Sequence, residues 1–330
     1  MGTVSDNSVD IKENDILQRD AKLLDLLLLD RTTGKNIKWA THDYANHGED
    51  FLYGEEIRVH CITRKYGRII RPRVSKSLKE QRFRVRDKAE VFTPSWLCNS
   101  QNNLVDEAWF GRKGVFNTES ENNWITNTSK IEFSDTLGKR WQDYIFSRRL
   151  EIACGEAPYL VSRYDNATGK SIPVSNRIGI LDRKLRVVSE NTSTCREWYK
   201  WANYAYKSVY GYEWQGDNLL LARENLLFTF MDFFQAKFGR IPAKKETRQI
   251  ANIISWNVWQ MDGLKCVVPD TCRTVLARAS LCLDGGPADK YIPCPGCESS
   301  NIHLHNGIYC RIRDWDTHRI ILFKNLINTP

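Results

Sequence analysis

The sequence has no long hydrophobic run. No uninterrupted run is longer than the four residues of Leu26–Leu29, far short of the ~20 apolar residues that span a bilayer. Residues 1–16 are polar and carry neither the basic start nor the apolar stretch of a secretory signal. Proline (10 residues) and glycine (19) are too scarce among 330 residues for a collagen-like or low-complexity chain. We therefore expect a globular protein of one large or two ordinary domains in a reducing, cytoplasmic compartment.

Several common catalytic motifs are also absent. There is no His-Glu-x-x-His pair and no Gly-x-Ser-x-Gly elbow, and Thr33-Gly34-Lys35 lacks the upstream glycine of a phosphate loop. Simple hydrolase and P-loop chemistry find no support in this pattern. Ten cysteines in 330 residues are too few for a disulfide framework and favour free thiols or a metal site.

The positive charge is concentrated in one segment. The net charge is +8, and residues 64–88 contain eleven Lys and Arg residues against two acidic ones. A phosphate backbone rewards such clustering, because each neutralised phosphate releases counterions. The segment therefore predicts contact with double-stranded DNA, and a solvated helix or hairpin face is the alternative. The predicted phosphate-binding residues are Arg71, Arg73, Arg82, Arg84 and Arg86.

From Arg149 onward the pattern predicts an α/β fold. Buried strands are expected at 150–153 and 209–213, and 250–259 is apolar enough to supply a helix or a strand. A long amphipathic helix is expected over 218–238. Strands that alternate with helices indicate βαβ units and a doubly wound, largely parallel sheet of the Rossmann type. An earlier helix is expected from Thr93 or Ser95 onward, with Trp96 and Leu104 facing inward.

Acidic residues occur at or near the ends of the predicted strands. Glu151 lies in the first, Glu213 ends the second and Asp262 follows the third. In an open parallel sheet, ligands bind at the carboxyl ends of the strands. A turn of small residues, 153–157, follows the first strand and would let the backbone approach a ligand. An acid after the second strand can accept from both ribose hydroxyls, and a third can accept from an adenine amino group.

This motif order resembles that of S-adenosylmethionine-dependent DNA adenine methyltransferases. The matching segments are Phe92-Thr93-Pro94, Glu151-Ile152-Ala153-Cys154-Gly155, Gly211-Tyr212-Glu213 and Gln260-Met261-Asp262. More narrowly, the chain is similar to the methylase (M) subunits of bacterial restriction-modification systems, which act in phage defence. The resemblance covers about residues 89–265. It implies a Rossmann-like methyltransferase domain that transfers a methyl group to the exocyclic amino group of adenine in DNA.

The resemblance also implies which residues bind the cofactor. The Thr-Pro segment and the turn after Glu151 would hold the methionine moiety, Glu213 would bind ribose, and Asp262 would contact adenine. The implied cofactor-binding residues are Thr93, Pro94, Glu151, Ala153, Gly155, Ala157, Glu213 and Asp262.

The sequence departs from the family pattern at two places. Ala157 stands where the family usually has a second glycine, and Glu156 and Pro158 flank it, which narrows the predicted space for the cofactor carboxylate. The catalytic Asn/Asp-Pro-Pro-aromatic tetrad is not found, since no two prolines are adjacent. We therefore expect the chain alone to bind DNA but to methylate it poorly, with a second subunit restoring activity. A non-catalytic DNA-binding or assembly subunit with a degenerate methyltransferase fold is the alternative.

A second pattern predicts structural zinc. Cys294-Pro-Gly-Cys297 is followed by His303, His305 and Cys310, a compact set of ligands suited to tetrahedral zinc. The predicted ligands are Cys294, Cys297, Cys310 and one of the two histidines, with His305 favoured by its spacing; Cys282 could replace a histidine. Buried reduced cysteines beside surface histidines are the alternative interpretation.

Two other enzyme classes fit these cysteines less well. A zinc deaminase needs an upstream His-x-Glu, which is absent. A cytosine carbon-5 methyltransferase would use Pro293-Cys294 and Glu190-Asn191 in the reverse chain order. The expected organisation is an N-terminal region over 1–88, a methyltransferase-like domain over 89–270 and a Cys/His-rich element over 271–330.

Overall fold

A three-stranded parallel sheet organises the computed structural model, which describes residues 10, 13–88, 90, 93–133, 138–277 and 290–327. Its strands are β3 (Arg149–Glu151), β4 (Val209–Glu213) and β5 (Val258–Gln260), in the spatial order β3-β4-β5. Glu151 pairs with Gly211, and Glu213 pairs with Gln260. The three carboxyl ends therefore lie together at one edge of the sheet.

Two pairs of helices connect the strands. The connection from β3 to β4 contains α7 (Ile180–Asn191) and α8 (Cys195–Lys207), and that from β4 to β5 contains α9 (Gly216–Phe238) and α10 (Lys244–Asn257). The Thr194 side chain caps α8, and Gly239, in the left-handed conformation, ends α9. Most residues of α9 are buried on all sides, which is the behaviour of a central helix.

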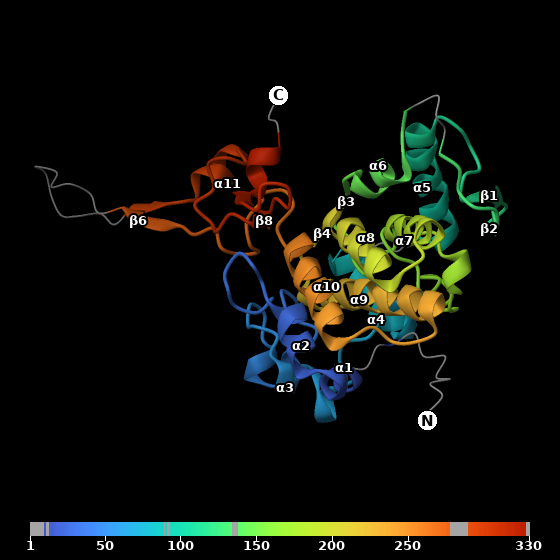
Figure 1. Ribbon diagram of the computed structural model, residues 1–330. Helices are drawn as coiled ribbons and strands as arrows, with labels where there is room; N and C mark the ends of the chain where they lie inside the picture. Colours follow the sequence, from blue (N-terminus) through green and yellow to red (C-terminus); the bar gives the residue numbers. More distant parts are fainter. Residues whose placement is uncertain are drawn as a thin grey trace, which may run out of the picture.

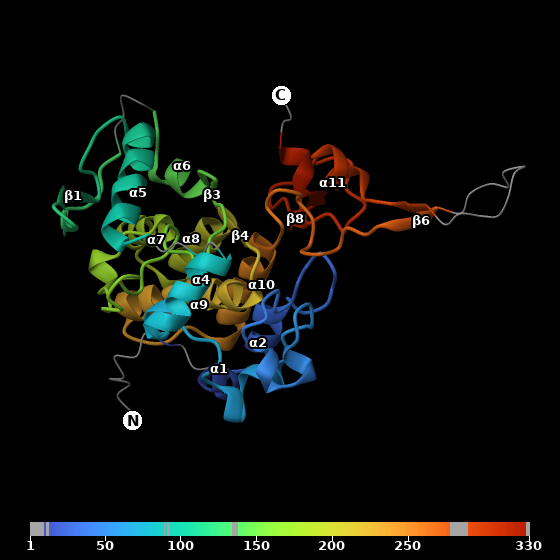
Figure 2. The same cartoon turned by 180° about the vertical axis from the view of Figure 1, so that it is seen from behind.

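The N-terminal part packs on these helices. Its helices are α1 (Glu13–Arg19), α2 (Ala21–Leu28), α3 (Val59–Ile62), α4 (Leu78–Lys88), α5 (Ser95–Phe110) and α6 (Trp141–Phe146). Helix α2 contacts α9 and α10 through a buried leucine face. One hydrophobic core runs from Ile16 to Val258 and so crosses the boundary expected at residue 88. Figure 2 shows α4 lying across α9.

The C-terminal elements form a smaller unit on the sheet's far side from α5 (Figure 1). Strand β6 (Val275–Ala277) pairs antiparallel with β7 (Lys290–Ile292), α11 (Pro295–Ser299) follows, and β8 (Arg311–Arg313) pairs antiparallel with β9 (Ile320–Leu322). A second hydrophobic cluster, which includes Trp259, Met261 and Phe323, joins this unit to the end of β5.

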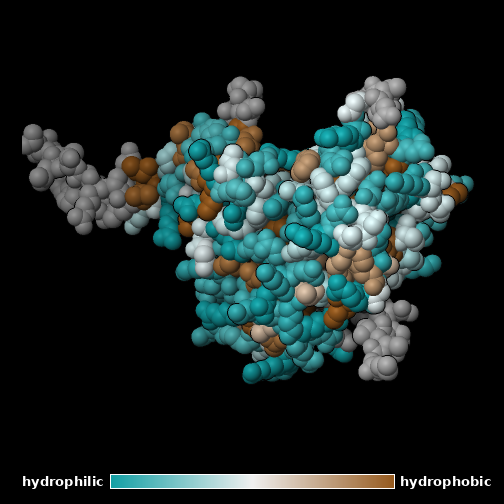
Figure 3. Space-filling model, in the orientation of Figure 1, coloured by the Kyte–Doolittle hydropathy of each residue, from teal (hydrophilic) through white to brown (hydrophobic). Residues whose placement is uncertain are grey.

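The remaining regular elements are short. An antiparallel hairpin is formed by β1 (Asn117–Ser120) and β2 (Asn123–Thr126). The 3-10 turns cover Ala45–His47, Glu49–Phe51, Arg64–Tyr66, Arg73–Ser75, Val174–Asn176 and Phe323–Leu326. Figure 3 shows a mostly hydrophilic surface with small hydrophobic groups, one of them at the β6–β7 hairpin. Within the described residues, no helix combines the length and apolar character needed to cross a membrane.

The structure confirms a mixed α/β chain, the strand at 209–213 and the long helix that ends at Phe238. A doubly wound Rossmann sheet is not found among the described residues, because the parallel sheet has three strands whose order runs in one direction. The predicted inward face of α5 is wrong. Leu104 is 63% exposed, and the buried face is polar, because Asp106 pairs with the buried Arg183 at 2.5 Å.

Candidate cofactor cavity and metal-ligand group

A cavity of about 960 Å³ opens at the carboxyl ends of the three parallel strands. Its walls come from the loop after β3, the end of β4, the segment after β5 and the chain around residues 86–93. Six of the eight predicted cofactor residues line it: Thr93, Glu151, Ala153, Gly155, Glu213 and Asp262. These residues come from four separate chain segments, and the fold brings them to one place.

The turn after β3 presents its backbone to this cavity. Ala153, Gly155 and Ala157 all have positive φ values (45°, 53° and 63°), which reverse the chain tightly. A Cβ added at Gly155 would meet no atom within 4 Å. The space beside Gly155 is therefore open to a ligand. Glycine suits this position because it adopts the left-handed backbone conformation without strain and lets a ligand come close to the backbone.

Glu151 and Glu213 are buried, and backbone amides hold their carboxylates. Glu151 accepts from the amides of Tyr159 (3.2 Å) and Leu160 (3.1 Å). Glu213 accepts from the amides of Gly155 (2.8 Å) and Gln215 (3.1 Å). Burial raises the pKa of Glu151 to about 8, although the backbone hydrogen bonds act to lower it. Burial also raises the pKa of Glu213. The hydrogen bond from the Gly155 amide to Glu213 joins the end of β4 to the turn after β3.

Asp262 lines the cavity together with other residues of its own loop. One carboxylate oxygen accepts from the Leu264 amide (3.0 Å), and the other pairs with the Lys265 ammonium group (3.2 Å). The aromatic residues Tyr53, Tyr159, Tyr212 and Trp214 also line the cavity. Sequence reasoning missed them. The only sequence signal was that Tyr212 and Trp214 flank the predicted ribose acid.

Two predicted cofactor residues do not line the cavity. The Pro94 carbonyl accepts from the amides of Leu97 and Cys98, so Pro94 is the N-cap residue that precedes α5. Ala157 is fully buried and shapes the turn from behind. Glu156 and Pro158 both line the cavity, and the Glu156 carboxylate accepts from the Arg73 amide (2.7 Å) and the Tyr164 hydroxyl. The narrowing expected at these two residues stays a prediction. Phe92 lies outside the described residues.

The basic segment is only partly a surface. Arg84 is 3% exposed and cannot reach a phosphate, so its predicted role is wrong. Its guanidinium pairs with Glu90 (2.5 Å), Asp43 (2.7 Å) and Asp217 (2.9 Å). Burial raises the pKa of Asp217, but Arg84 and Lys76 outweigh it and lower that pKa to about 2. Arg84 thus joins α4 to the start of α9.

The other four predicted arginines differ in their surroundings. Arg71 pairs with Glu80 at 2.9 Å, and the Arg73 guanidinium donates to the Glu90 carbonyl at 2.9 Å. Arg82 and Arg86 are exposed on α4, and Arg86 also lines the cavity. Lys88 and Lys265 line the same cavity. The basic side chains of the segment are therefore divided among ion pairs, exposed positions and the cavity wall.

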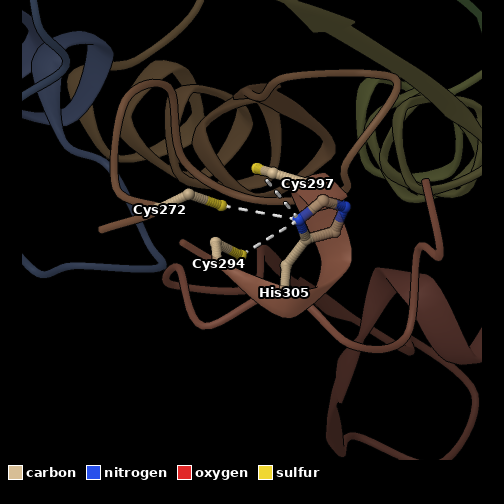
Figure 4. A group of neighbouring side chains, drawn as sticks. All are labelled: Cys272, Cys294, Cys297 and His305. Carbon is tan, nitrogen blue, oxygen red and sulfur yellow. Dashed lines mark hydrogen bonds between the residues drawn. The ribbon is translucent and has the colours of Figure 1, made fainter. Parts of the chain in front are cut away.

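Three cysteines and one histidine form a compact group in the C-terminal unit: Cys272, Cys294, Cys297 and His305. Figure 4 shows the three sulfur atoms pointing at one ring nitrogen of His305. The His305 Nδ1 atom lies 3.5, 3.6 and 3.7 Å from the sulfurs of Cys272, Cys294 and Cys297. Tetrahedral zinc with ordinary Zn–S and Zn–N bonds separates such a nitrogen and sulfur by about 3.6 Å. The group can therefore bind a metal ion such as zinc.

The charges of this group also suit a cation. Burial raises the pKa of Cys294, but backbone amides of Asn306 and Cys297 and the His305 ring outweigh it and lower the pKa to about 6. Burial and the neighbouring Cys294 and Cys297 thiols raise the pKa of Cys272 to about 12. Three thiolates at this spacing repel one another unless a cation lies between them.

The structure corrects the predicted ligand set at one position. Cys310 is buried elsewhere, with its thiol 3.4 Å from the Gln260 carbonyl, and Cys272 takes its place. His305 belongs to the group and His303 does not. Sequence reasoning missed Cys272 because the β6–β7 hairpin separates it from Cys294. The sequence signal for this ligand set would have been Cys272 on one side of the β6–β7 hairpin and Cys294 and Cys297 on the other. Cys282 lies outside the described residues.

Compared with protein-family models, curated proteins and solved structures, the chain gives no match in any of the three searches, so its function must be inferred from the geometry of these two sites.

Proposed function

We propose that the chain binds S-adenosylmethionine in the cavity at the sheet's carboxyl edge and serves DNA adenine methylation, as the methyltransferase or as its cofactor-binding subunit. One observation carries the proposal: six residues implied by a single family resemblance line the same cavity. Acids at successive strand ends support the proposal, since ligands of open α/β sheets bind at the carboxyl ends of the strands. A role in a restriction-modification system follows from the resemblance alone.

In this proposal the described residues hold the cofactor. Glu213, which lines the cavity, accepts from the ribose hydroxyls, and the open face of Gly155 leaves room for a ligand to contact the backbone. In the same arrangement, Asp262 would accept from the adenine amino group, and Glu151 would lie near the positively charged methionine end. Four aromatic side chains in the walls can stack on the purine. When bound, the cofactor supplies a methyl group on a sulfonium, ready for transfer to a nucleophilic amino group.

A DNA adenine methyltransferase must also hold the target base. The tetrad that holds an extruded adenine is not found in the sequence. Asn257, the asparagine just before β5, donates to the carbonyls of Tyr206 and Val209 and accepts from Trp315. Because all its polar atoms are engaged, it is not free to bind a base. This observation favours the second candidate function, a cofactor-binding or assembly subunit that needs another chain for methyl transfer.

We expect the isolated chain to bind duplex DNA with strong salt dependence and to transfer little methyl to it. Exposed arginines on α4 make phosphate contacts in this proposal, so Arg82→Ala should reduce the slope of log affinity against log salt by about 1. Filter binding across salt concentrations measures the slope, and labelled methyl transfer to mixed genomic DNA measures activity. Robust methyladenine production by the chain alone would refute the need for a second subunit, and salt-independent binding would refute the phosphate contacts.

Cofactor affinity should depend on pH through Glu151. Its pKa of about 8 in the free chain means that the carboxyl is largely protonated at pH 7. A cationic ligand favours the ionised form, so binding releases a proton and affinity rises with pH, by up to about tenfold per unit, until it levels off near pH 8. Calorimetry in two buffers of different ionisation enthalpy measures the released proton. Glu151→Gln should abolish the release; an unchanged release in this variant would contradict the assignment.

The same raised pKa has a consequence for the unliganded chain. Between the ordinary glutamate value near 4.5 and about 8, the folded chain holds a proton on Glu151 that the unfolded chain has lost. Stability from this group is therefore complete below pH 4.5 and falls as pH rises towards 8.

We propose that the metal-ligand group of Cys272, Cys294, Cys297 and His305 holds one structural zinc ion. Protein purified without added zinc should contain about one equivalent. Cys272→Ser should lose most of this metal, whereas Cys310→Ser, a matched change of a nearby buried cysteine, should retain it. Metal analysis of the three proteins decides between the two ligand sets. Retention in Cys272→Ser with loss in Cys310→Ser would reverse the assignment, and metal-free, well-folded wild-type protein would remove the site.

A further inference from the structure

The cavity and the metal-ligand group share one chain segment, residues 261–272. At its start, Met261, Asp262, Leu264 and Lys265 line the cavity. At its end, Cys272 supplies a sulfur to the ligand group. Asp262 and Cys272 are only ten residues apart along the chain, so the two sites are directly connected.

The cavity end of this segment is a tight loop closed by hydrogen bonds. The Asp262 amide donates to the Val267 carbonyl, and the Cys266 amide donates to the Asp262 carbonyl, both at 2.8 Å. Cys266 takes a left-handed conformation to close the loop (φ 56°). Leu264, at the loop tip, is 90% exposed. The Met261 amide donates to the Glu213 carbonyl (3.0 Å) and holds the start of the loop, while residues 266–272 hold its other end.

Residues 266–271 pair with the segment that leaves His305. The Val268 amide donates to the Ile308 carbonyl (2.8 Å), and the Cys310 amide donates to the Cys266 carbonyl (3.0 Å). The Thr271 hydroxyl bridges the same two segments: it donates to the Val268 carbonyl (2.7 Å) and accepts from the Ile308 amide (3.0 Å). This pairing holds residues 266–268 against the C-terminal unit.

Two of the metal ligands, Cys272 and His305, lie just beyond one end of these paired segments. Cys272 follows Val268 by four residues, and His305 precedes Ile308 by three. The packing between them is close: a Cβ at Gly307 would lie 2.9–3.0 Å from atoms of Thr271 and Cys272. A metal bound to Cys272 and His305 would clamp both segments together, because one ion would bond to a side chain of each.

We propose that metal binding at this group positions the Asp262 loop and thereby sets the affinity of the cavity for its ligand. The loop-positioning step rests on metal binding at this group and on the hydrogen bonds between the two segments, and the affinity step rests in addition on the proposed cofactor function. Because coupling between two sites is reciprocal, cofactor binding should also slow metal loss.

Hydrogen exchange and a binding titration test the two steps separately. Full-length protein is compared with and without metal, which is removed by a chelator or by Cys272→Ser; Cys195→Ser, a cysteine of α8 outside both sites, is the control. We expect the amides of Asp262, Cys266 and Val268 to exchange at least about tenfold faster without metal, while the amides of β4 are unchanged. Affinity for S-adenosylhomocysteine should fall about tenfold, and the control should match wild type.

The possible outcomes distinguish failure of the metal–loop coupling from failure of the proposed function. Equal loop exchange with and without metal would overturn the inference, whatever the ligand does. Faster exchange with unchanged S-adenosylhomocysteine affinity would overturn the coupling. If metal-loaded wild type does not bind S-adenosylhomocysteine at all, the proposed function fails, and loop exchange still decides whether the metal positions the loop.

Discussion

Replacing Arg84 by alanine should lower the free energy of unfolding by about 3–5 kcal/mol. The side chain is 4% exposed and pairs with three carboxylates, of which Asp217 is fully buried. The substitution leaves Asp217 and Glu90 without their main cationic partner in a place that water does not reach. Such an uncompensated buried charge is among the few single changes with so large a cost.

Arg82→Ala is the matched control, since Arg82 is exposed on the same helix. Its stability should stay within about 0.5 kcal/mol of wild type. Urea denaturation followed by tryptophan fluorescence gives both values. Equal stability of Arg84→Ala and Arg82→Ala would mean that Arg84 does not anchor α4 to α9.

The pH profile offers a second readout of the same cluster. The lowered pKa of Asp217, about 2 instead of 3.8, stabilises the folded chain above pH 4, and this contribution is lost as pH falls through 2. In Arg84→Ala the carboxyl loses its main cationic partner, so this acid-dependent loss should become smaller.

Replacing Glu213 should weaken cofactor binding by about 10–150-fold for each charge-assisted hydrogen bond that is lost, or about 1.5–3 kcal/mol per bond. The carboxylate ends β4 inside the cavity and, in this proposal, accepts from two ribose hydroxyls. Glu213→Gln keeps the side chain's size and removes its charge, so it is preferable to alanine at a position that also accepts from the Gly155 amide.

The ribose assignment is tested with a ligand that lacks the 2′-hydroxyl. Wild type should bind 2′-deoxy-S-adenosylhomocysteine at least about tenfold more weakly than S-adenosylhomocysteine, and Glu213→Gln should discriminate much less. Thermal melts of the free proteins control for unfolding. If both proteins discriminate equally between the two ligands, Glu213 does not bind the ribose.

Sequence patterns over a few neighbouring residues predicted which residues lie at the carboxyl edge of the parallel sheet. The alternating burial of Val209–Glu213 and the small-residue turn after Glu151 are encoded over a few neighbouring residues. Acids that follow such strands reach the same edge because the strands are parallel. For this reason, Glu151, Glu213 and Asp262 could be identified from the sequence, whereas Glu90 and Glu156, which also line the cavity, were missed.

Tertiary partners could not be predicted in this way. Arg84 resembles its exposed neighbours in the sequence, and only the approach of Asp217 and Asp43 buries it. The polar inward face of α5 likewise depends on Arg183, which lies on another helix. Cys272 reaches Cys294 only because a hairpin returns the chain to its start. In each case the deciding contact joins segments that no sequence window covers together.

Calorimetric titration of the metal-loaded chain with S-adenosylmethionine and S-adenosylhomocysteine tests the central claim most directly. We predict one binding site per chain for each ligand, with a rise in melting temperature that grows with ligand concentration. Neither heat nor thermal stabilisation at millimolar concentrations of either ligand would contradict the claim that the cavity at the ends of β3, β4 and β5 holds this cofactor.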